Sequence, residues 1–108
     1  MILTYLYLAL AIIAEVLATM LLVISNQFTK FWPSCGVLFG YGISFYLLSI
    51  VVLELPISVV YATWSGVGIA AITLLGYFIY QQSLSWQVIL GLSLIIIGVI
   101  LIHMFLGD

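Results

Sequence analysis

A single carboxylate, Glu15, stands inside an otherwise apolar run, ALAIIAEVLATMLL at residues 9–22. Insertion scales assign about 2.5–3.5 kcal/mol to a charged side chain at the centre of a membrane-spanning helix. Low dielectric disfavours the ionised form, so such a group can hold a proton and, after releasing it, attract a cation. Acids at this depth usually mark a proton or substrate pathway, and the alternative is a protonated acid that bonds a neighbouring helix.

Small residues surround Glu15 at helical spacing. Positions three, four and seven residues away include alanines and a threonine, which lie on the same face of a helix as the acid. These neighbours are Leu8, Ala11, Ile12, Ala18, Thr19 and Leu22. Small side chains permit either close helix approach or room for a ligand.

Two other apolar runs place aromatic residues on one helical face, in mid-span. They are Tyr41 and Phe45, with Ser44 and Leu48 beside them, and Tyr61 and Trp64, with Gly68 one turn on. A carboxylate facing aromatic rings suits an apolar cation, because the acid supplies charge and the rings supply cation–π contact. The alternative is that the rings only pack between helices.

Composition assigns the chain to the membrane, since it is 68% hydrophobic and 4% charged. A soluble domain of this length would carry about 25% charged residues. Four apolar runs each reach the roughly 20 residues that span a bilayer. They cover about 2–24, 34–53, 57–80 and 86–106. We therefore predict an all-α membrane protein with one four-helix transmembrane domain over residues 1–108, in which short linkers make successive helices antiparallel.

Membrane orientation is weakly encoded. Lys30 is the only lysine or arginine, so the charge asymmetry that normally sets topology is nearly absent. Such a chain is able to insert both ways up, which permits an antiparallel, dual-topology homodimer. Cys35 is the only cysteine and leaves no disulfide within the chain.

Glycines and one histidine mark the third and fourth runs. Gly66 and Gly68 flank a valine and predict either a bend or tight packing. Gly91 and Gly98 lie one heptad apart in a run without charge or mid-span aromatics, which favours a dimer interface. His103 is expected to be a wetted residue near the membrane surface rather than a ligand.

Other chemistry is not indicated. The sequence contains no nucleophile–base arrangement, metal-ligand cluster or phosphate-binding loop, so we predict no enzyme, cofactor or metal. A net charge of −2 on four charged side chains indicates no nucleic-acid partner.

Four motifs, in this order and spacing, resemble those of the small multidrug resistance transporters. They are AEVLAT, FTKFWPS, YATWSGVG and GLSLIIIGV. The resemblance extends from Tyr5 to about Leu106. Within the family it favours the quaternary-ammonium exporters, because the guanidinium-exporting branch usually carries a tryptophan shortly after the glutamate, where this chain has Val16, Leu17 and Ala18.

The resemblance implies a homodimer in the bacterial inner membrane that exports lipophilic or quaternary cations by alternating access. Proton influx would drive export, with protons and substrate competing for Glu15 of both subunits. By motif, the site would be formed by Glu15, Tyr41, Tyr61 and Trp64, with Leu8, Ala11, Ala18, Thr19, Ser44 and Phe45 around it. Gly66 and Gly68 would form the bend, and the run with Gly91 and Gly98 the dimer seam.

The sequence also departs from the family pattern, chiefly by lacking loop charges. Val23 stands where a lysine is usual and Asn26 where an acid is frequent; the usually charged third linker is uncharged, including Ser83 and Ser85. Position 18 is alanine where glycine is frequent. Two alternatives therefore stay open: a non-transporting or heteromeric membrane subunit, and an exporter of guanidinium, polyamines or a lipid-linked sugar.

Overall fold

The structure, a computed structural model, describes residues 2–106 and contains four helices within them. They are α1 (Ile2–Ile24), α2 (Phe31–Val51), α3 (Ile57–Ile79) and α4 (Trp86–Phe105). All four are long and apolar enough to cross a membrane. The prediction of an all-helical chain with four span-length helices is thus confirmed, whereas the antiparallel dimer and the single-domain organisation stay predictions.

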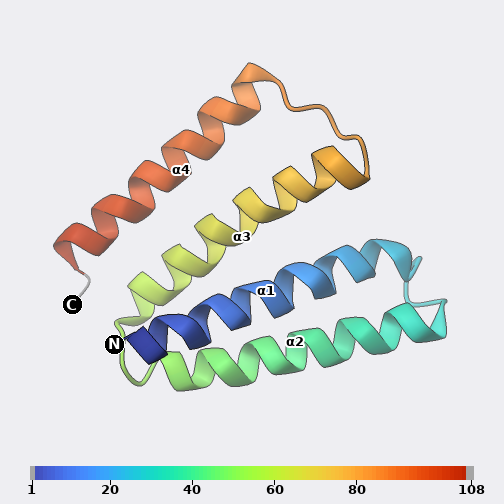
Figure 1. Cartoon of the computed structure of the whole chain (residues 1–108), viewed down its shortest axis with the longest axis horizontal. Helices are drawn as coiled ribbons and strands as arrows, with labels where there is room; N and C mark the ends of the chain where they lie inside the picture. The colour runs from blue at the N-terminus through green and yellow to red at the C-terminus, as the bar shows by residue number, and fades with distance from the viewer. Residues whose placement is uncertain (1, 107–108) are drawn as a thin grey trace. The chain divides into compact units, whose positions relative to one another are not determined.

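The chain divides into two units, Met1–Glu54 and Leu55–Asp108. Figure 1 shows each unit as a hairpin, α1 with α2 and α3 with α4. Each hairpin is described by itself below.

Helix α2 begins three residues before the predicted span, so Pro33 lies inside its first turn. Proline is tolerated there because the first four N–H groups of a helix have no intrahelical partner. The helix ends at Val51, after which the backbone N–H of Val52 still bonds to the carbonyl of Leu48 at 3.0 Å.

The link between α1 and α2 is a tight turn through the left-handed region. Asn26, Gln27 and Phe28 have φ of 48°, 66° and 64°. The buried Ser25 organises this turn: its hydroxyl donates to the carbonyl of Leu22 at 2.7 Å and accepts from the N–H of Phe28 at 3.2 Å. The turn brings α2 back along α1.

Close packing in the first hairpin depends on a glycine opposite small residues. A Cβ at Gly40 would lie 2.8 Å from the Cβ of Ala18 and 3.2 Å from the carbonyl oxygen of Ala14. Small residues let helix backbones approach closely in lipid. The small residues of α1 were predicted to permit either close helix approach or room for a ligand. At Ala14 and Ala18 they permit close helix approach.

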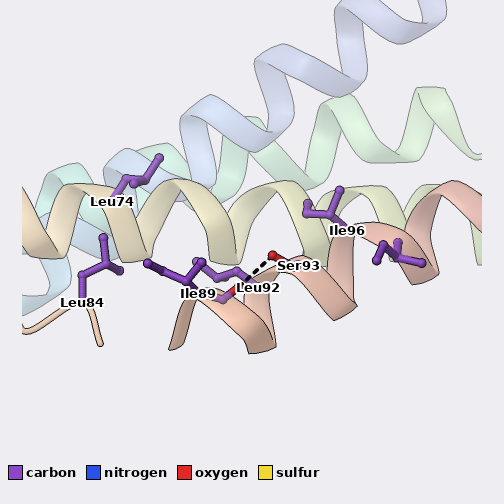
Figure 2. Close-up of a pocket in the computed structure, with 7 residues that line it drawn as sticks. Leu74, Leu84, Ile89, Leu92, Ser93 and Ile96 are labelled. Carbon is purple, nitrogen blue, oxygen red and sulfur yellow. Dashed lines mark hydrogen bonds between the residues drawn. The ribbon is translucent and has the colours of Figure 1, made fainter. Parts of the chain in front are cut away.

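The second hairpin is in close contact near the start of α3 and the end of α4. A Cβ at Gly66 would lie 2.6 Å from Cγ2 of Val99. Toward the connecting loop the two helices enclose a pocket of about 440 Å³, whose position is shown in Figure 2. It is lined by Leu74, Leu84, Ile89, Leu92, Ser93, Ile96 and Ile97. The lining is apolar apart from Ser93, whose hydroxyl donates to the carbonyl of Ile89.

Candidate functional site

Glu15 is half-buried in the middle of α1, and its carboxylate is hydrogen bonded. The hydroxyl of Thr19, one turn later on the same face, donates to Oε2 of Glu15 at 2.6 Å. The same hydroxyl lies 2.7 Å from the phenolic oxygen of Tyr41 on α2. Three side chains from two helices therefore form one connected polar group.

The direction of the hydrogen bonds that link Tyr41, Thr19 and Glu15 depends on where the protons are. When Glu15 is ionised, Thr19 gives its single hydroxyl proton to the carboxylate, and the phenol of Tyr41 is then the donor to Thr19. The order in that state is Tyr41 to Thr19 to the carboxylate. Hydrogen bonds to an ionised acceptor are stronger than bonds between neutral groups.

Tyr41 also joins the acid to an aromatic surface. Its ring stacks on that of Phe45, with ring centroids 6.3 Å apart and planes at 22°. Phe45 is exposed and Tyr41 is half-buried. The first hairpin therefore brings together a carboxylate, two hydroxyls and two stacked rings, which is a suitable set for holding an apolar cation.

The remaining predicted site residues of this hairpin are buried. They are Leu8, Ala11, Ala18 and Ser44. Within the described part of the chain, the hydroxyl oxygen of Ser44 is buried and has no hydrogen-bond partner. Their contact with a substrate stays a prediction.

The predicted aromatics of α3 form a second pair. The rings of Tyr61 and Trp64 meet edge to face, with centroids 5.5 Å apart and planes at 76°. Among residues 2–106, no acceptor is bonded to the buried indole Nε1 of Trp64. A buried N–H without a partner is available to a ligand or a carboxylate. Tyr61 and Trp64 belong to the second unit, so their membership in one site with Glu15 stays a prediction.

The predicted hinge and dimer glycines differ in their surroundings. Helix α3 continues through Gly66 and Gly68, which are both buried. A Cβ at Gly91 or Gly98 would meet nothing within 4 Å. None of the described residues of α4 is buried. The bend and the dimer interface stay predictions.

One interhelical contact was not predicted from the sequence. His103 was expected to be a wetted terminal residue, but its Nε2 lies 2.5 Å from the hydroxyl oxygen of Thr63 on α3. The sequence did contain a signal for this contact, because both residues are polar and lie in apolar helices. Thr63 is near the start of the third span and His103 is near the end of the fourth. Antiparallel neighbours bring such positions to the same level.

Over residues 2–106, no group of three or more histidine, cysteine, aspartate or glutamate side chains is placed to hold a metal ion.

Comparison with known proteins decides the family. The family model described as Small Multidrug Resistance protein matches residues 3–95, most of the chain. This chain belongs to the small multidrug resistance family. Members of the family are transporters rather than enzymes. Family membership and the four span-length helices together indicate a multi-pass protein of the bacterial inner membrane.

Several relatives of this chain are named for the compounds to which they confer resistance or for multidrug transport. It is 39% identical over 101 residues to the quaternary ammonium compound-resistance protein QacG of a Staphylococcus species, covering 94% of both chains. It is 42% identical over 100 residues to the quaternary ammonium compound-resistance protein QacE of Escherichia coli, covering 93% of this chain and 91% of the relative. The multidrug transporter EmrE of Escherichia coli K12 is 43% identical, with the same coverage.

Proposed function

We propose that this protein is a proton-coupled antiporter that exports lipophilic or quaternary ammonium cations by single-site alternating access. Protons and cation would compete for Glu15 of both subunits of a homodimer. The observation that carries the proposal is the acid itself: a carboxylate in an apolar helix, held by Thr19, which in turn accepts from Tyr41. The names of QacG, QacE and EmrE support the class of cargo.

The exchange step needs no covalent chemistry on the cargo. Ionised Glu15 attracts a cation into a site where water is scarce, so the electrostatic attraction is weakly screened. A proton arriving at the carboxylate neutralises it, and the cation loses its counter-ion and leaves. Because one group serves both, occupancy by one ligand excludes the other, which couples the two fluxes.

The aromatic residues supply the preference for bulky apolar cations. Tyr41 and Phe45 offer a stacked surface next to the acid, and Tyr61 and Trp64 offer a second surface on α3. Rings attract a cation through their faces and also bury its apolar groups. Guanidinium can stack on a ring but has no apolar groups to bury against it, so it gains less from such surfaces.

The test is uptake by proteoliposomes that contain the purified protein alone. Tetraphenylphosphonium uptake is driven by a pH gradient and compared between the native protein and Glu15→Gln. The matched control is Glu54→Gln, since Glu54 is an exposed carboxylate in the link between α2 and α3. We expect Glu15→Gln to abolish driven uptake and Glu54→Gln to retain it.

Three outcomes would contradict the proposal in different ways. Equal uptake by native protein and Glu15→Gln would show that the acid is not the coupling site. No uptake by the native protein alone, restored by an unlike partner, would favour the heteromeric alternative. The same vesicles, loaded with guanidinium instead, distinguish the cargo: faster transport of guanidinium than of tetraphenylphosphonium would contradict the assigned substrate class.

A further inference from the structure

We propose that Thr63 and His103 form a latch between α3 and α4, and that both are positioning residues for cation binding because they fix the segment that carries Trp64. The inference rests on the proposed function and assigns a role to two residues outside the predicted site. We call this pair the Thr63–His103 latch.

The latch joins residues 40 positions apart in the sequence. Oγ1 of Thr63 and Nε2 of His103 are 2.5 Å apart, and both side chains are half-buried. Depending on its tautomer, the neutral ring either accepts from the threonine hydroxyl or donates to it, so the contact is available in both forms. Hydrogen bonds between polar side chains hold helices together in membrane proteins.

The latch is next to the closest apolar contact of the hairpin. Gly66 lies one turn after Thr63 on α3, and Val99 lies one turn before His103 on α4. A Cβ at Gly66 would be 2.6 Å from Cγ2 of Val99. The hydrogen bond and the glycine contact therefore act on consecutive turns of both helices, and fix their distance and their rotation at this end.

Toward the connecting loop, the second hairpin borders the open pocket seen in Figure 2, with Leu74 of α3 on one side and Ile89 of α4 on the other. The Thr63–His103 bond and the contact of Gly66 with Val99 lie farther from that loop. Tyr61 and Trp64 belong to the same stretch of α3 as Thr63.

Rotation of α3 connects the latch to the site. Successive residues in a helix point about 100° apart, so the direction of the Cα–Cβ bond of Trp64 is set once Thr63 is fixed. The indole forms its edge-to-face contact with Tyr61 from that orientation. Loss of the latch would let the first half of α3 rotate, and the aromatic pair would be presented to the cation in many orientations rather than one.

The test compares variants that remove or restore the bond. Thr63→Val removes the hydroxyl at nearly constant volume, His103→Leu removes the ring nitrogen, and His103→Asn keeps an amide able to bond a hydroxyl. The matched control is Thr73→Val on the same helix, because the hydroxyl of Thr73 bonds only to its own helix, at the carbonyl of Ile69. Equilibrium binding of tetraphenylphosphonium and its uptake rate are measured for each.

We expect Thr63→Val and His103→Leu each to raise the Kd by about 3- to 15-fold, the range for one interhelical hydrogen bond in a membrane. The uptake rate at saturating cation should stay within about twofold, since the acid is intact. The double variant should be no weaker than either single variant. His103→Asn should bind like the native protein, and so should Thr73→Val.

A spectroscopic readout separates the latch from a general loss of stability. His103 is the only histidine, so its ring gives a single pair of ¹⁵N resonances in labelled protein. Thr63→Val should shift the Nε2 resonance, whereas Thr73→Val should not. An unchanged Nε2 resonance, unchanged Kd values, additive losses in the double variant, or failure of His103→Asn to restore binding would each overturn the latch.

Failure of the proposed function is recognised separately. If Glu15→Gln binds tetraphenylphosphonium like the native protein, the antiport proposal fails whatever the latch variants do. If Glu15→Gln loses binding while Thr63→Val and His103→Leu keep it, the antiport proposal stands and the latch proposal fails.

Discussion

The hydroxyl of Thr19 lies 2.6 Å from the carboxylate of Glu15, one helical turn away on the same helix. Two residues four positions apart in the sequence are therefore directly hydrogen bonded. The acid is not solitary in the apolar helix, because the threonine links it to Tyr41 on the neighbouring helix at 2.7 Å. Two helices of one hairpin therefore supply the acid of the proposed site and the hydroxyl groups bonded to it.

Removal of the Thr19 hydroxyl is expected to weaken cation binding at neutral pH. Thr19→Val deletes a donor to the ionised carboxylate, and bonds to charged groups contribute about 1.5–3 kcal/mol. The Kd for tetraphenylphosphonium at neutral pH should therefore be higher for Thr19→Val than for the native protein. Thr19→Ser retains the hydroxyl and serves as the control. Equal Kd values for Thr19→Val and Thr19→Ser would contradict the role of this bond.

The native protein should bind cations more tightly as the pH rises. If protons and cation compete for Glu15 as proposed, affinity should increase with pH and then reach a plateau once the acid carries no proton. Binding of tetraphenylphosphonium measured from pH 5 to pH 9 checks this. A Kd independent of pH across that range would rule out competition at the acid.

A larger side chain at Gly40 is expected to force α1 and α2 apart. The Cβ position there is 2.8 Å from the Cβ of Ala18, so Gly40→Val should destabilise the hairpin by about 1–3 kcal/mol, as overpacking usually does. At Gly42, two positions along the same helix, a Cβ would meet nothing within 4 Å. Thermal unfolding in detergent should show a lower Tm for Gly40→Val than for Gly42→Val. Equal Tm values would contradict the close contact.

The open face of α4 is expected to bind a second copy of the chain. Among the described residues, a Cβ at Gly98 would meet nothing within 4 Å, so this position leaves room for a partner helix. We expect this variant to lower the dimer fraction in analytical ultracentrifugation, with Gly42→Leu as an exposed-glycine control. A dimer fraction equal to that of the native protein would remove Gly98 from the interface.

Several features were predictable because they depend on one helix at a time. Span length, the acid at mid-span and the aromatic faces all follow from helical periodicity and the thickness of a bilayer. The early start of α2 was not anticipated, because Pro33 was interpreted as part of the linker, whereas the first turn of a helix tolerates proline. Helix ends depend on a few local hydrogen bonds and are harder to predict than helix interiors.

By itself the sequence determined that this is a four-span membrane protein of the small multidrug resistance type, with one intramembrane acid and aromatic residues suited to cations. Only the tertiary structure decided which side chains meet across helices: Tyr41 with Thr19, Gly40 with Ala18, and Thr63 with His103. The physical reason is register. Periodicity along one helix defines its faces, but the level at which two helices touch depends on where small residues let their backbones approach, and that is a property of the packed pair.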